Sequence, residues 1–99
     1  MNKYRAKKSG KYASRREQKR ADELVLMQQC GLISDLEEQV KFELVPKQQG
    51  ERAVTYTADF RYKENGETVV EDSKGMKTQQ YVIRRKLMLW VHKIRVRES

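Results

Sequence analysis

The chain has 99 residues, enough for one domain with a modest hydrophobic core. Its net charge is +8, and all of the surplus lies in residues 1–20, because the acids and bases of the remaining chain cancel. No apolar run is long enough to span a membrane, and no apolar core follows the N-terminal charges as it would in a secretory signal. The single cysteine, Cys30, excludes an intrachain disulfide, so we expect a protein of the reducing cytoplasm.

Residues 1–13 are predicted to form a flexible basic arm that precedes a single domain at residues 14–99. Such an arm usually binds a polyanion, above all nucleic acid, and a solubilising tail is the alternative. The candidate nucleic-acid contacts at this end of the chain are Lys3, Arg5, Lys7, Lys8, Lys11, Arg15 and Arg16.

Residues 14 to about 30 are predicted to form the first helix. Ser14 and Glu17 match a Ser-x-x-Glu capping box, and Ala21 and Leu24 belong to an apolar stripe that should face the core. Glu17 lies on the same face as that stripe. Its carboxylate is therefore either a helix cap, favoured also by the helix dipole, or an acid directed toward a functional site.

Residues 36–45 are predicted to form a half-buried strand that ends at Pro46. Apolar residues occupy one phase of this segment, as a strand with one buried face requires: Leu36, Val40, Phe42 and Leu44. A polar loop at residues 47–52 then leads to the next strand.

A β-hairpin is predicted over residues 56–75, with Asn65-Gly66 as a two-residue type I′ turn. The first strand alternates apolar and polar residues, so one inward face is expected from Tyr56, Ala58, Phe60 and Tyr62.

The turn also predicts the register of the hairpin, because Glu64 should pair with Glu67. Asp59 then lies opposite Asp72, and Lys74 lies on the same face opposite Thr57. Like charges that oppose each other are destabilising, and a Mg²⁺ ion, which takes one or two carboxylates, waters and phosphate oxygens, would offset them. The alternative is a solvated polar face on which Lys74 is the only counter-ion.

A second helix is predicted at about residues 78–92, with Thr78 as its N-cap. Its expected core stripe is Ile83, Leu87, Trp90 and Val91. The run Arg84, Arg85 and Lys86 is either a solvated basic face or a set of phosphate contacts. Ile94 and Val96 then predict a short edge strand.

Asp59, a hairpin and then Asp72-Ser73-Lys74 resemble the PD-(D/E)xK signature of metal-dependent nucleases. The flanking segments YTADFRY, VVEDSKGMKT and RRKL are similar to those of small phage- and prophage-encoded nucleases of the Holliday-junction-resolvase-like group. The resemblance covers most of the chain beyond the first dozen residues. Ala58 stands where the name of the signature has proline, which is not a metal ligand.

This resemblance implies an α/β fold with a restriction-endonuclease-like αβββαβ core, a mixed sheet flanked by helices, and the predicted element order agrees with it. It implies an endonuclease that uses Mg²⁺ or Mn²⁺ to cut DNA, with branched or Holliday-junction DNA as candidate substrates, in the cytoplasm of a bacterial host. Asp59 and Asp72 would be metal ligands, Glu17 a third ligand and Lys74 a catalytic residue that orients the attacking water. Symmetric cutting would need two sites, which makes a homodimer a candidate assembly. A non-catalytic nucleic-acid-binding module is the alternative.

Overall fold

The first helix, α1 (Arg15–Gln29), begins where the sequence predicts it, because the Ser14 side chain accepts a hydrogen bond from the backbone of Glu17. The computed structural model describes residues 14–99, so the basic residues predicted to bind nucleic acid between Lys3 and Lys11 lie outside the described part of the chain. No helix in that part is long and apolar enough to cross a membrane.

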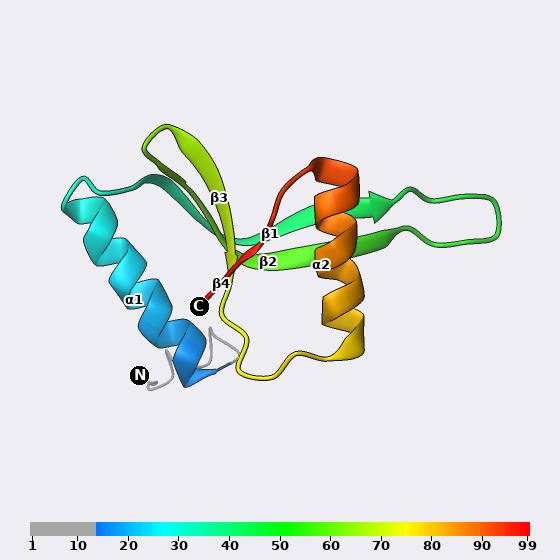
Figure 1. Ribbon diagram of the computed structural model, residues 1–99, viewed down its shortest axis with the longest axis horizontal. Helices are drawn as coiled ribbons and strands as arrows, with labels where there is room; N and C mark the ends of the chain where they lie inside the picture. Colours follow the sequence, from blue (N-terminus) through cyan, green and yellow to red (C-terminus); the bar gives the residue numbers. More distant parts are fainter. Residues whose placement is uncertain (1–13) are drawn as a thin grey trace, which may run out of the picture.

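The fold is α/β, with a mixed four-stranded sheet and two helices in the predicted order (Figure 1). The sheet order is β1-β2-β3-β4, in which β2 is antiparallel to both β1 and β3, and β4 runs parallel to β3. The remaining elements are β1 (Ser34–Val45), β2 (Val54–Glu64), β3 (Glu67–Asp72), α2 (Gln79–His92) and β4 (Arg97–Glu98). This confirms the predicted αβββαβ arrangement.

The turn between β2 and β3 has the predicted geometry and register. Asn65 and Gly66 both have positive φ angles, 53° and 80°, and Glu64 pairs with Glu67. The predicted pairing of Lys74 with Thr57 is wrong, because β3 ends at Asp72. Beyond Asp72, the Ser73 backbone N–H donates to the side-chain carboxylate of Asp59 on β2 and not to a backbone carbonyl of that strand.

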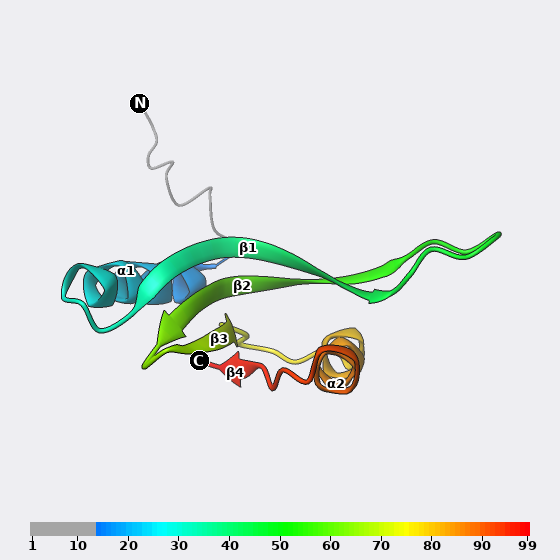
Figure 2. The same ribbon diagram turned by 90° about the horizontal axis from the view of Figure 1, so that it is seen from above.

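Two hydrophobic clusters flank the sheet, one under each helix (Figures 1 and 2). The α1 cluster consists of Ala21, Leu24, Ile33, Phe60 and Tyr62. The α2 cluster consists of Leu44, Tyr56, Ala58, Val70, Tyr81, Met88 and Val96.

These clusters correct the prediction of one inward face on β2, formed by Tyr56, Ala58, Phe60 and Tyr62. The first two of these residues pack under α2 and the last two pack under α1. The change occurs around Asp59, because Ala58, Asp59 and Phe60 are buried in succession and the alternation of buried and exposed residues on β2 is interrupted there. At the same level of β1, Gln39 has a left-handed φ of 54°.

The predicted core stripe of α2 is also wrong in most of its members. Ile83 is 56% exposed and Trp90 is 75% exposed, and Val91 is exposed as well, whereas Tyr81 and Met88 are buried. The hydroxyl of Tyr81 donates to Glu98, which holds this side of the helix against the sheet. Leu87 is partly buried against the α2 cluster, as predicted.

Candidate functional site

Asp59 and Asp72 lie together at the centre of the sheet, as the hairpin register predicts. The Asp59 backbone N–H donates to Asp72 Oδ1 at 3.2 Å, and the Ser73 N–H donates to Asp59 Oδ2 at 2.8 Å. The exposed fraction is 6% for Asp59 and zero for Asp72, so the alternative of a solvated polar face is wrong. We call these two residues the acidic pair.

Two further side chains contact Asp72. The Tyr56 hydroxyl donates to Asp72 Oδ2, and Lys74 Nζ lies 3.7 Å from Asp72 Oδ1. Burial and the neighbouring Asp59 carboxylate raise the pKa of Asp72 to about 7, although the Tyr56 hydrogen bond and the Lys74 charge oppose this rise. The pKa of Tyr56 is also raised, by burial and by its contact with Asp72. Near neutral pH the binding of a proton or of an additional cation would therefore offset the repulsion between the two carboxylates of the acidic pair.

The raised pKa of Asp72 makes stability depend on pH. Between its ordinary value of 3.8 and about 7, the folded state holds a proton that the unfolded state has lost, so the free energy of unfolding falls as pH rises through this window. Asp72→Asn should remove this contribution and raise the metal-free melting temperature at pH 8 by at least about 4 °C, which corresponds to about 1 kcal/mol for a domain of this size.

The measurement is thermal unfolding in EDTA from pH 4 to pH 8, and the difference between the Asp72→Asn and wild-type melting temperatures should grow across this range. Asp22→Asn, which changes an exposed carboxylate on α1, is the matched control and should follow the wild type. A constant difference between Asp72→Asn and wild type at all pH values would contradict the assigned pKa.

A pocket of about 420 Å³ opens beside the acidic pair, between β2, the segment after β3 and α2. Tyr56 and Lys74, the two side chains that contact Asp72, line this pocket together with Thr57, Tyr81 and Arg84. We call it the Lys74 pocket. Two cations, Lys74 and Arg84, thus line a pocket whose wall includes both side chains that contact Asp72.

Glu17 is linked through Gln39 to the level of the sheet at which the acidic pair lies. Its carboxylate is 4% exposed, and Oε2 accepts a hydrogen bond from Gln39 Nε2 at 2.9 Å. Gln39 lies on β1 between the residues that pair with Ala58 and Phe60, which is the level of Asp59 in the sheet. No group of three or more His, Cys, Asp or Glu residues that could hold a metal ion occurs within residues 14–99. The two carboxylates of the acidic pair are adjacent through the hydrogen bonds of the Asp59 and Ser73 backbone N–H groups.

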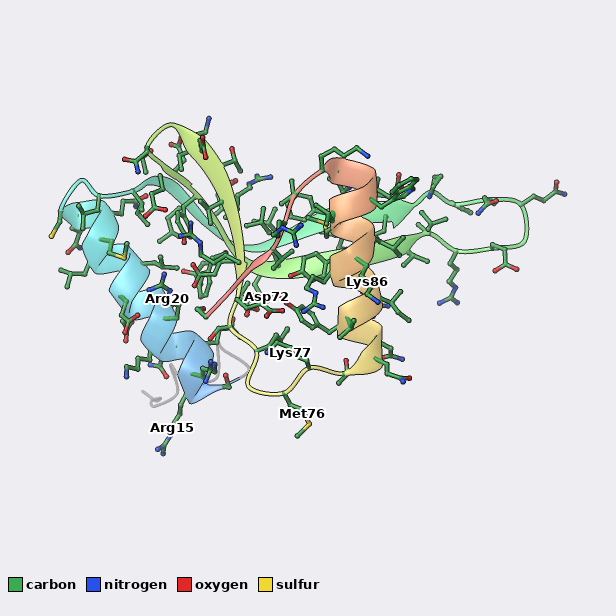
Figure 3. The ribbon with its side chains drawn as sticks, viewed as in Figure 1. Arg15, Arg20, Asp72, Met76, Lys77 and Lys86 are labelled. Carbon is green, nitrogen blue, oxygen red and sulfur yellow. The ribbon has the colours of Figure 1, made fainter. Side chains whose placement is uncertain are left out.

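A second pocket, of about 440 Å³, carries the basic residues of α1 and reaches Ser73, the neighbour of Asp72. Arg15 and Arg16, predicted to bind nucleic acid, line it, and Arg15 points away from the body of the protein (Figure 3). The Arg16 guanidinium donates two hydrogen bonds to the Ser99 carbonyl. Lys19 also lines this pocket. Sequence reasoning missed it, although it lies one helical turn after Arg15 and hence on the same face.

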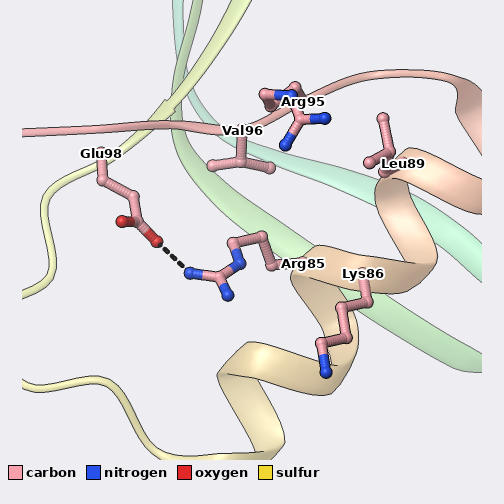
Figure 4. Close-up of a pocket in the computed structure, with 6 residues that line it drawn as sticks. All are labelled: Arg85, Lys86, Leu89, Arg95, Val96 and Glu98. Carbon is pink, nitrogen blue, oxygen red and sulfur yellow. Dashed lines mark hydrogen bonds and ion pairs between the residues drawn. The ribbon is translucent and has the colours of Figure 1, made fainter.

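The predicted basic run on α2 is divided between two pockets. Arg84 donates to the Thr55 carbonyl and lines the Lys74 pocket. Arg85 and Lys86 line a third pocket, of about 430 Å³, together with Arg95 (Figure 4). Arg85 forms an ion pair with Glu98 at 2.8 Å, as Figure 4 shows. Arg95 was not among the predicted nucleic-acid contacts.

A buried ionic network next to the acidic pair was not predicted. Glu71 is fully buried, and Arg20 of α1 donates to both of its carboxylate oxygens, at 2.6 and 3.2 Å. The Tyr62 hydroxyl donates to the same carboxylate. Burial alone would raise the pKa of Glu71, but its hydrogen bonds, above all those from Arg20, hold this pKa below the usual value. The network fastens α1 to β3 one residue before Asp72.

The fold and the site define a small α/β protein with a buried acidic pair and basic pockets around it. The chain belongs to the family described as "Protein of unknown function (DUF1064)", whose model matches residues 1–97. No curated protein and no solved structure was found to match the chain.

Proposed function

We propose that this protein is a metal-dependent endonuclease that hydrolyses phosphodiester bonds of DNA, with branched and Holliday-junction DNA among its candidate substrates. The observation that carries the proposal is the acidic pair, Asp59 and Asp72, with the Lys74 ammonium 3.7 Å from Asp72. This placement supports the resemblance of the sequence to the PD-(D/E)xK signature. The proposal places the reaction in the cytoplasm of a bacterial host, as expected for a nuclease of phage or prophage type.

The residues of the site fit Mg²⁺ or Mn²⁺. Hard cations prefer carboxylate oxygens, and Mg²⁺ needs only one or two from the protein because waters and phosphate oxygens complete its shell. Asp59 and Asp72 would hold the ion, which would also relieve the charge that raises the pKa of Asp72. Glu17 is the candidate third ligand, since its partner Gln39 lies at the level of Asp59. When bound, the ion would lower the pKa of a coordinated water and neutralise charge on the phosphate.

The side chains of the Lys74 pocket supply the remaining chemistry. Lys74 would hold the attacking water beside the acidic pair and stabilise the negative charge that develops as the water oxygen bonds to phosphorus and the ester bond breaks. Arg84, which lines the same pocket, would position the phosphate. Tyr56 fixes the Asp72 carboxylate through its hydrogen bond.

The experiment that tests the proposal is incubation of the protein with end-labelled linear duplex, flap and four-way-junction DNA. We expect cleavage of at least one of these substrates with Mg²⁺ or Mn²⁺ and none with EDTA. Comparison of the three substrates identifies the preferred DNA structure. If a homodimer acts, both DNA strands should be cut equally. The mass of the protein–DNA complex in solution should then correspond to two copies of the chain. No cleavage under any metal condition would contradict the proposal.

A non-catalytic nucleic-acid-binding module is the second candidate, and one observation favours it. Asp72 is fully buried and hydrogen-bonded by Tyr56, which is also how a purely structural carboxylate is accommodated. The two candidates make the same prediction for binding and opposite predictions for cleavage.

Removal of residues 1–11 separates binding from chemistry. The deletion takes away five cations, and each lost phosphate contact should flatten the slope of log affinity against log salt by about 0.9 on duplex DNA. The shortened protein should therefore bind DNA more weakly and with less salt dependence, yet cut at an unchanged rate when DNA is saturating. An unchanged salt slope would mean that this segment is a solubilising tail and that the pockets of α1 and α2 carry the phosphate contacts.

A further inference from the structure

The hairpin that joins β1 and β2 extends past α2 as a narrow two-stranded ribbon (Figures 1 and 2). Its tip is closed by two backbone hydrogen bonds, Gln48 N–H to the Glu51 carbonyl at 3.1 Å and Glu51 N–H to the Gln48 carbonyl at 2.9 Å. Gly50 has a φ of 80°, which the turn requires. The ribbon is thus a defined structure that projects from the body of the protein. We call residues 47–52 the ribbon tip.

The ribbon tip presents only polar side chains. All of its residues are exposed, and none of its side chains forms a hydrogen bond or an ion pair within residues 14–99. Its side chains are two amides, two cations and one carboxylate, from Gln48, Gln49, Lys47, Arg52 and Glu51. The ribbon tip buries no apolar surface within the protein, so its polar side chains can contact a partner.

Duplex DNA fits this surface better than a protein does. The major groove, about 12 Å wide, admits a two-stranded ribbon, and glutamine pairs with the base edge of adenine as arginine pairs with that of guanine. The cores of protein–protein interfaces are enriched in aromatic residues, methionine and arginine, of which the ribbon tip has only Arg52.

We propose that the ribbon tip enters the major groove of duplex DNA and reads base edges with Gln48, Gln49 and Arg52. This inference rests on the proposed function, to which it adds the part of the substrate that is recognised. Gly50 precedes Asp59 by nine residues, in the segment that leads into β2 and in β2 itself, a separation of at most about 30 Å at the rise of a strand. One turn of duplex DNA is about 34 Å long. The bases that are read therefore lie up to about nine base pairs from the bond at the acidic pair.

The test is selection of bound DNA from a pool of duplexes with randomised base pairs, carried out in EDTA so that no cleavage is needed. Wild type should select adenine-containing sites and bind them at least about fivefold more tightly than the same sites with G·C substitutions. Gln48→Ala/Gln49→Ala, which leaves the net charge unchanged and keeps Arg52, should lose this preference for adenine-containing sites.

The matched control is Lys63→Ala/Glu67→Ala, a charge-neutral change of two exposed residues near the β2–β3 turn. It should keep the wild-type preference, and unchanged melting temperatures verify that both variants are folded. Binding of all duplexes equally by wild type, or a preference retained by the glutamine variant, would overturn the inference. A change of oligomeric state in the glutamine variant, with base preference unchanged, would also overturn it and make the ribbon a contact between copies of the chain.

The outcomes for the ribbon and for the nuclease are separable. If wild type cleaves DNA but shows no base preference that depends on the ribbon tip, the proposed nuclease function is supported and the proposed role of the ribbon tip is wrong. Ribbon-dependent preference without cleavage would support the ribbon and favour the binding module over the nuclease.

Discussion

Asp59→Asn and Asp72→Asn should each slow DNA cleavage by at least about 1,000-fold. The expected size follows from the several kcal/mol that a bound metal ion contributes to the transition state, at 1.36 kcal/mol for each tenfold change in rate. Lys74→Gln should cost about 100- to 1,000-fold, the usual effect of removing one group that stabilises developing charge.

Single-turnover cleavage at saturating DNA measures these rates. DNA affinity should stay largely unchanged in the aspartate variants, since the proposal assigns the phosphate contacts to cations outside the acidic pair. Asp22→Asn, which alters an exposed carboxylate on α1, is the matched control and should cut at the wild-type rate. Full-rate cleavage by either variant of the acidic pair would show that the catalytic centre lies elsewhere.

Arg20→Met should lower the free energy of unfolding by about 3–5 kcal/mol, the cost of removing one member of a buried ion pair. It would leave the fully buried Glu71 carboxylate with its charge uncompensated by Arg20. For a domain of this size the melting temperature should fall by at least about 12 °C. Urea unfolding at pH 7 measures the loss.

Two further variants make this result specific. Arg20→Met/Glu71→Met should recover most of the lost stability, because an apolar pair of similar volume replaces the buried ion pair at little net cost. Arg61→Met, which breaks an exposed ion pair with Glu37, should cost less than about 1 kcal/mol. If Arg20→Met and Arg61→Met were equally stable, the buried network would not fasten α1 to β3.

The acidic pair could be predicted because its geometry follows from local turn chemistry. Asn65-Gly66 determines which residues of β2 and β3 face each other, and this placed Asp59 beside Asp72 before any tertiary contact was known. The helix starts at Ser14 and Thr78 were predictable for the same reason, since an N-cap acts within its own first turn.

The phase of α2 could not be predicted from hydrophobicity alone. Ile83 and Trp90 are more apolar than Tyr81, yet Tyr81 faces the sheet because its hydroxyl reaches Glu98. That partner is seventeen residues away and on another element. Tertiary contacts of this kind override the periodicity of a single segment.

The polar environment of the site was missed for a similar reason. Arg20 and Glu71 are 51 residues apart, and nothing near either residue in the sequence indicates that they meet. The contact of Tyr56 with Asp72 was hidden because Tyr56 fitted an apolar strand face. Its hydroxyl group needs a hydrogen-bond partner when buried, and that requirement was the available signal.

The central claim is that Asp59 and Asp72 together hold a divalent cation at the DNA backbone. The most direct measurement is anomalous diffraction at the manganese edge from crystals of the protein with DNA and Mn²⁺. We predict an anomalous peak in contact with both carboxylates and with a phosphate oxygen of DNA in the Lys74 pocket. DNA bound in that pocket with no peak at the acidic pair, or with its only peak at other residues, would contradict the claim.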